Sequence, residues 1–89
     1  MPGTYDWRRF GSVPEAVVTI VGDHYGLYGR ILPLETDLSA DLGSDDLDRL
    51  EVIMTVEELF DVRFDARSWA SARTLRDLAA QVEEALARQ

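Results

Sequence analysis

Three short stretches of this chain carry the residue pattern that begins an α-helix, and apolar residues at helical spacing follow each of them. In residues 12–15 a serine hydroxyl can accept the first unpaired amides, a proline sits where its missing N–H does no harm, and a glutamate can reach back. Asp45 is a good N-cap with Asp48 in the first turn, and Thr74 with Asp77 forms a similar capping arrangement. These signals predict three main helices.

The apolar spacing sets the bounds that we expect for each element. Helices are predicted over about 13–25, 46–60 and 75–88, with a short helical stub near 66–70. Residues 26–44 form a long connection, which we expect to be held in place by its own apolar side chains. No segment alternates between apolar and polar residues over a strand's length. The predicted fold class is therefore all-α, with three main helices, a short additional helix and a long first loop.

Length and composition narrow the class of protein. Eighty-nine residues suffice for one small domain, which we place at 12–89, after an irregular N-terminal arm at 1–11 whose aromatic side chains pack back on the domain. Without cysteine, and with His24 as the single histidine, no metal site is predicted. No run of about 18 apolar residues occurs, so we expect a cytoplasmic monomer that does not span a membrane.

The negative charge of the chain is concentrated in one segment. The net charge is −8, all nine basic residues are arginine, and residues 41–61 hold eight acids against the single base Arg49. Nucleic acid would be repelled, because no stripe of basic residues offsets this charge. A concentrated negative surface instead favours basic protein partners, although a merely solvated helix face would have the same composition.

The helix predicted over 46–60 has more apolar positions than one core face can bury. The expected core stripe consists of Val52, Val56, Leu59 and Phe60. A second stripe at the same spacing must face water: Asp48, Glu51, Thr55 and Glu58. Because Leu47, Leu50 and Met54 lie beside this acidic stripe, we expect some of them to be exposed next to carboxylates.

The stretch from Asp41 to Glu51, which reads DLGSDDLDRLE, closely resembles the signature of acyl carrier proteins. In that family the run is Asp-Leu-Gly-x-Asp-Ser-Leu-Asp-x-hydrophobic-Glu. Residues 52–60 also resemble the family's second helix, residues 13–27 its first helix, and Thr74-Leu75 the start of its last helix. The resemblance extends over about 13–87 and implies an acyl-carrier-protein-like four-helix bundle.

The resemblance also implies a function. In carrier proteins a serine at the start of the second helix receives 4'-phosphopantetheine from coenzyme A, and synthases and acyltransferases offer Arg and Lys patches to the acidic helix. Carried over by position, the partner-docking residues, here called the docking face, are Asp45, Leu47, Asp48, Leu50, Glu51, Met54, Glu57 and Glu58. Such a set suits a transient interface with a small apolar centre and a charged rim.

This chain departs from the family pattern at one position: Asp46 stands where the family has the attachment serine. A carboxylate is a poor nucleophile for this transfer and would give a labile acyl phosphate, so no cofactor is expected unless a serine is restored or another hydroxyl is used. Ser44 lies two residues upstream, where it would point elsewhere. Asp46 could stabilise the helix through its dipole by roughly 0.3–1 kcal/mol, mimic the charge of the modified state, or lock the protein unmodified.

Several functions remain compatible with the sequence. The leading interpretation is a carrier-like module that docks on fatty-acid, polyketide or related acyl-transfer enzymes without carrying the chain. The alternatives are a genuine carrier with a substituted serine or an unusual modification site, and a helical interaction protein with unrelated partners. An enzyme is not predicted, because no nucleophile, base pair or metal set supports one.

Overall fold

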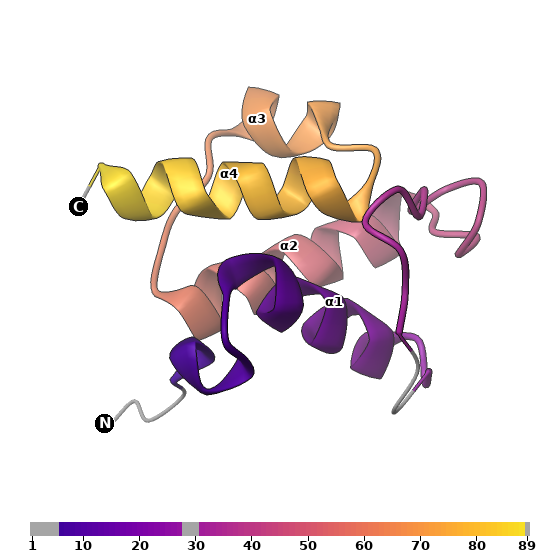
Figure 1. The fold of residues 1–89 in the computed structure, drawn as a ribbon. Helices are drawn as coiled ribbons and strands as arrows, with labels where there is room; N and C mark the ends of the chain where they lie inside the picture. Colours follow the sequence, from indigo (N-terminus) through magenta and orange to yellow (C-terminus); the bar gives the residue numbers. More distant parts are fainter. Residues whose placement is uncertain (1–5, 28–30, 89) are drawn as a thin grey trace.

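Helices form the whole of the regular structure in the computed structural model, which describes residues 6–27 and 31–88. The elements in chain order are a 3-10 helix η1 (Trp7–Phe10), α1 (Val13–His24), α2 (Asp46–Phe60), α3 (Ala66–Ser71) and α4 (Leu75–Ala87). Figure 1 shows α1, α2 and α4 as the three long helices, with the short α3 lying over α4. The all-α prediction is confirmed. Among the described residues, no helix has both the length and the apolar character needed to cross a membrane.

The three long helices begin at the caps that the sequence predicts. The Ser12 hydroxyl accepts the Glu15 amide at 3.3 Å at the start of α1. Before α4, the Thr74 side chain accepts the Asp77 amide at 3.1 Å while the Asp77 carboxylate accepts the Thr74 amide at 3.2 Å. Such a reciprocal pair satisfies two amides that have no partner within the helix. The first residues of these helices can be predicted from the sequence because each cap joins residues only three positions apart.

The end of α1 lies one residue earlier than predicted, at His24 rather than residue 25. Gly26 has a φ of +73°, its amide donates to the Asp23 carbonyl at 3.1 Å, and the Leu27 amide donates to the Gly22 carbonyl at 2.8 Å. This pair of bonds is the Schellman motif, in which a glycine in the left-handed conformation ends the helix. The terminus of α1 therefore has a defined geometry, which fixes the place of His24.

The core lies between α1, α2 and α4. Its largest fully buried side chains are Leu38, Leu75, Leu78, Val17, Val21, Val52, Val56 and Val82. The predicted core stripe of α2 is buried at Val52, Val56 and Phe60, while Leu59 is only partly buried and Ile53 joins the core. Burial of this face leaves the acidic side of α2 directed away from the core.

The N-terminal arm is more regular than predicted. Trp7–Phe10 form η1, where the Asp6 carboxylate accepts the Arg8 amide at 3.1 Å. The Trp7 ring lies 5.6 Å, centroid to centroid, from the Phe60 ring of α2. The predicted packing of an aromatic residue on the domain is therefore observed, whereas an irregular conformation is wrong for residues 7–10. Residues 1–5 lie outside the described residues, and the boundary at residue 12 stays a prediction.

The connection between α1 and α2 is fastened to the start of α4. Leu38 is buried, the Leu38 amide donates to the Arg73 carbonyl at 2.8 Å, and the Leu75 amide donates to the Thr36 carbonyl at 3.1 Å. An isolated antiparallel bridge joins residues 37 and 74. We call these contacts between residues 34–38 and 73–76 the loop–α4 clamp (Figure 1). Ile31, expected to help anchor the connection, is 95% exposed.

Candidate functional site

Asp46, which the family resemblance assigns to the attachment position, is the first residue of α2. Asp45 caps the helix, because its carboxylate accepts the Asp48 amide at 2.8 Å and its own amide donates to the Asp48 carboxylate at 3.3 Å. Gly43, at a φ of +69°, turns the chain into this cap. Asp46 takes no part in the capping pair, and its side chain is exposed. A carboxylate therefore stands at the helix start, where phosphopantetheine attachment would require a hydroxyl. The residue present does not fit that group.

The hydroxyl of Ser44, two positions upstream of Asp46, faces a partner within the protein. Ser44 is only 7% exposed, its hydroxyl is hydrogen-bonded to the Tyr25 hydroxyl, and its amide donates to the Leu38 carbonyl at 2.9 Å. Burial raises the pKa of Tyr25, to which the nearby Asp48 and Asp45 charges add while the Ser44 hydrogen bond acts against them. Ser44 is thus buried against Tyr25, whereas Asp46 is exposed, so the two side chains have different surroundings.

The docking face has an exposed apolar centre. Leu47, Leu50 and Met54 are 63%, 39% and 58% exposed, so the expectation that apolar side chains of α2 face solvent is confirmed. These three positions recur at intervals of three and four along α2, which aligns them on one side of the helix. Large apolar side chains grouped on the surface mark an interaction site more often than isolated ones do.

The acidic side chains of the docking face differ in how far they are exposed to solvent. Asp45, Glu51 and Glu58 are exposed, whereas the structure shows Asp48 and Glu57 to be half-buried. Glu57 accepts the Phe64 amide at 2.9 Å, so this carboxylate also stabilises the turn after α2. Its assignment to the docking face stays a prediction, with a structural role beside it.

Arg49, the single base among the acids, has a role that the sequence analysis did not find. Its Nη2 atom donates to the carbonyls of Trp69 at 3.1 Å, Ala70 at 3.3 Å and Ala72 at 2.6 Å. These carbonyls lie at the end of α3, where helical acceptors lack intrahelical donors. Arg49 therefore fastens α3 to α2. A groove of about 460 Å³ beside it is lined by Asp46, Arg49, Leu50, Trp69 and Ala70.

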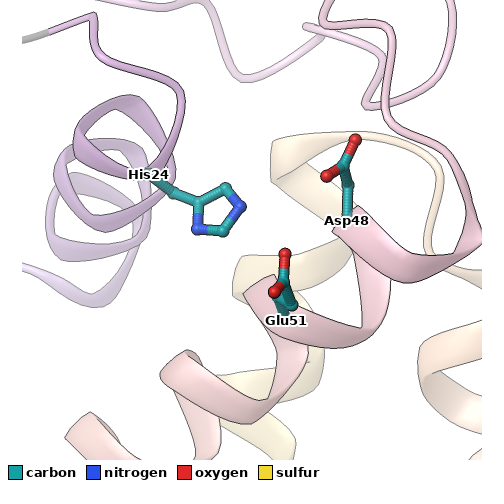
Figure 2. Close-up of side chains that lie close together, drawn as sticks. All are labelled: His24, Asp48 and Glu51. Atoms are coloured by element: carbon teal, nitrogen blue, oxygen red, sulfur yellow. The ribbon is translucent and has the colours of Figure 1, made fainter.

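The structure also brings the single histidine next to the docking face. His24 ends α1, and Figure 2 shows its imidazole pointing toward the Asp48 and Glu51 side chains of α2. One ligand atom from each of the three residues lies within 4.8 Å of the other two. The sequence analysis assigned His24 no such neighbours, because the crossing of α1 and α2 cannot be read from local patterns.

Comparison with known proteins identifies the family to which this helical fold belongs. The sequence profile of the family described as "Phosphopantetheine attachment site" matches residues 15–82. The acyl carrier protein 3 of Ralstonia nicotianae is 43% identical over 53 residues, which cover 60% of this chain and 61% of that protein. The acyl carrier protein of Syntrophobacter fumaroxidans is 36% identical over 62 residues, covering 70% of this chain and 76% of that protein.

A third relative extends the match over more of the chain. The acyl carrier protein of Trieres chinensis is 33% identical over 67 residues, which cover 75% of this chain and 84% of that protein. The fold and the matched segment define a phosphopantetheine-type carrier domain. The chain belongs to the acyl carrier protein family. Members of this family are carriers rather than catalysts, which agrees with the prediction that the chain is not an enzyme.

Proposed function

We propose that this protein is a carrier-shaped binding module that docks on fatty-acid, polyketide or other acyl-transfer enzymes without being phosphopantetheinylated at the usual position. The observation that carries the proposal is the exposed carboxylate of Asp46 at the first position of α2, within a signature and a docking face that otherwise follow the family pattern. In this proposal the protein still docks on carrier-dependent enzymes but no longer carries a covalently attached cargo.

The chemistry of attachment supports the loss of carriage. Phosphopantetheine transfer requires a hydroxyl that attacks the pyrophosphate of coenzyme A and leaves a durable phosphodiester. The Asp46 carboxylate is a poor nucleophile for that reaction, and the mixed anhydride that it would form hydrolyses readily. Ser44 is buried against Tyr25. These observations speak against the alternative in which the nearest hydroxyl takes over the modification.

The surface of α2 supports the docking role. Leu47 and Met54 offer exposed apolar area, and the carboxylates beside them would meet Arg and Lys side chains on a partner. Complementary charge around a small apolar centre speeds association and selects partners more than it raises affinity. Arg49 keeps its positive charge while it donates to the end of α3, but it stands alone against the eight acids of residues 41–61, so the segment stays strongly negative.

Modification of the purified protein separates a non-carrier from a genuine carrier. The protein is incubated with coenzyme A and a promiscuous phosphopantetheinyl transferase and then weighed intact. We expect no change in mass for the wild type and the gain of one phosphopantetheinyl group for Asp46→Ser. The matched control Asp46→Asn removes the charge without supplying a hydroxyl and should stay unmodified. A gain of mass by the wild type would refute the loss of carriage.

Charge reversal on α2 tests the docking role. Glu51→Lys and Glu58→Lys should each weaken binding to a carrier-dependent synthase or acyltransferase, chiefly by lowering the association rate. Glu83→Lys makes the same change of charge at an exposed position of α4 and serves as the control. Equal effects at the three positions would show that only net charge matters.

The modification assay also tests the remaining alternative. If phosphopantetheinyl transferase fails to modify Asp46→Ser, that result would favour a helical protein with unrelated partners.

A further inference from the structure

The His24, Asp48 and Glu51 side chains form a cluster of metal-ligating groups from two different helices. The three ligand atoms lie within 4.8 Å of one another (Figure 2). His24 and Glu51 are exposed and Asp48 is half-buried, so a dissolved ion can reach all three. Within residues 6–27 and 31–88, neither the His24 imidazole nor the Glu51 carboxylate takes part in a hydrogen bond or an ion pair. The His24 ring makes an edge contact with the Tyr25 ring, 4.9 Å between centroids, which holds the ring plane without using its nitrogens.

Two of the three positions are fixed by the ends of helices. The Schellman motif at Gly26 sets where α1 ends at His24, and the capping pair with Asp45 holds Asp48 in the first turn of α2. The cap uses one carboxylate oxygen of Asp48, Oδ2. Its other oxygen remains for a ligand. Glu51 follows Asp48 by three residues and so lies on the same side of α2.

The separation suits a metal ion better than it suits a direct contact. Bonds of about 2.0–2.2 Å from nitrogen and oxygen to a tetrahedral zinc ion set the ligand atoms about 3.4 Å apart. The His24 and Glu51 side chains are exposed and so can rotate to bring their ligand atoms, which already lie within 4.8 Å, to that distance. The surrounding charge favours a cation, since Asp45 and Asp46 add two carboxylates at the start of the same helix.

The identity of the donors selects the class of metal. Imidazole suits zinc and other late first-row transition ions, whereas an all-oxygen set suits calcium or magnesium. One histidine and two carboxylates leave the fourth position of a tetrahedral ion open. We propose that His24, Asp48 and Glu51 bind a Zn²⁺ ion that bridges α1 and α2, with its fourth position open to water or to a ligand from a partner.

Zinc at this place would change the docking face. Asp48 and Glu51 belong to that face, and a bound divalent cation neutralises both carboxylates. Zinc would therefore lower the negative potential that attracts a basic partner. The site itself does not depend on docking or on the loss of phosphopantetheinylation, so zinc binding can be measured on the isolated protein.

The first measurement is isothermal titration of metal-stripped, tag-free protein with Zn²⁺ at physiological salt. We expect one ion per chain, and His24→Gln should weaken binding by about tenfold or more. Glu51→Gln should also weaken it. The matched control Glu58→Gln removes the same charge from the same helix outside the cluster and should bind as the wild type does. Equal losses in Glu51→Gln and Glu58→Gln would overturn the site in favour of diffuse attraction to the acidic helix.

Two further measurements test whether the His24 imidazole itself binds the ion. Because His24 is the single histidine of the chain, its imidazole gives one set of NMR signals, which should shift on zinc binding. Titration with Ca²⁺ should be insensitive to His24→Gln, since calcium prefers oxygen ligands. Unchanged imidazole signals at saturating Zn²⁺, or wild-type zinc affinity in His24→Gln, would show an adventitious ion only.

Discussion

Replacing Arg49 with methionine tests whether one guanidinium holds α3 against α2. Methionine keeps an unbranched apolar stem of similar reach and removes only the charged donors. Nη2 carries two hydrogens, so the three acceptors at Trp69, Ala70 and Ala72 share two donors, and the shortest contact, 2.6 Å to Ala72, dominates. The variant therefore loses about two hydrogen bonds from a charged group.

The expected loss of folding free energy in Arg49→Met follows from the number of hydrogen bonds removed and from their exposure to solvent. A hydrogen bond to a charged group contributes about 1.5–3 kcal/mol. The Ala70 contact is exposed and the other two are only part-buried, so water can replace much of what the donors supply, and we expect a total loss of about 2 kcal/mol, close to the value of one such bond rather than two. For a domain of this size that loss lowers Tm by about 8–16 °C.

Thermal and urea unfolding, followed by circular dichroism and tryptophan fluorescence, measure the effect; Trp69 of α3 and Trp7 of η1 both contribute to the fluorescence. Arg76→Met is the matched control, because it removes the same charge from an exposed ion pair with Glu35. Such pairs contribute about 0–1 kcal/mol. If Arg49→Met costs no more than Arg76→Met, the contacts with the α3 carbonyls do not stabilise the fold and the reasoning fails.

The remaining predictions concern the core, the acid side of the stability profile and the buried hydroxyl pair. Leu78→Ala, at a fully buried position, should cost about 2–5 kcal/mol in urea unfolding, whereas Leu47→Ala at an exposed position should stay within about 0.5 kcal/mol. Hydrogen bonds from the backbone amides of residues 73 and 74 hold the pKa of Asp77 below its usual range. Its ionised form therefore stabilises the fold at neutral pH, and this contribution is lost as the pH falls below about 4. Asp77→Asn should flatten the pH dependence of unfolding there, and an unchanged acid profile would contradict the assignment. Ser44→Ala and Tyr25→Phe should each cost about 0.5–1.5 kcal/mol, and the double variant should cost less than their sum, because both remove one hydrogen bond. Full additivity would mean that the two hydroxyls act separately.

Features that depend on neighbouring residues could be predicted from the sequence. The caps at Ser12, Asp45 and Thr74 each join residues three apart, so their pattern is visible without the fold. The start and end of α2 match the prediction, and the exposed leucines of that helix follow from its excess of apolar positions. The family signature added the location of the attachment position.

Features that depend on how helices cross could not be predicted in this way. Arg49 reaches carbonyls twenty or more residues away, and His24 meets Asp48 only because the end of α1 lies beside the first turns of α2. The 3-10 helix at Trp7–Phe10 carries no helical periodicity of its own and is held by packing on α1 and Phe60. Tertiary contacts decide such details, and one sequence does not encode them as a local pattern.

The loop–α4 clamp has a consequence for the order of folding. It joins the Leu38 amide to the Arg73 carbonyl and the Leu75 amide to the Thr36 carbonyl, across α2 and α3 in the chain, so its hydrogen bonds close a long segment. Closing such a segment costs entropy that local helix formation does not, and contacts of this kind form late. We expect the amides of Leu38 and Leu75 to exchange with solvent only when the whole domain opens. The two ends of the clamp would then unite the helices and their long connection in one cooperative unit.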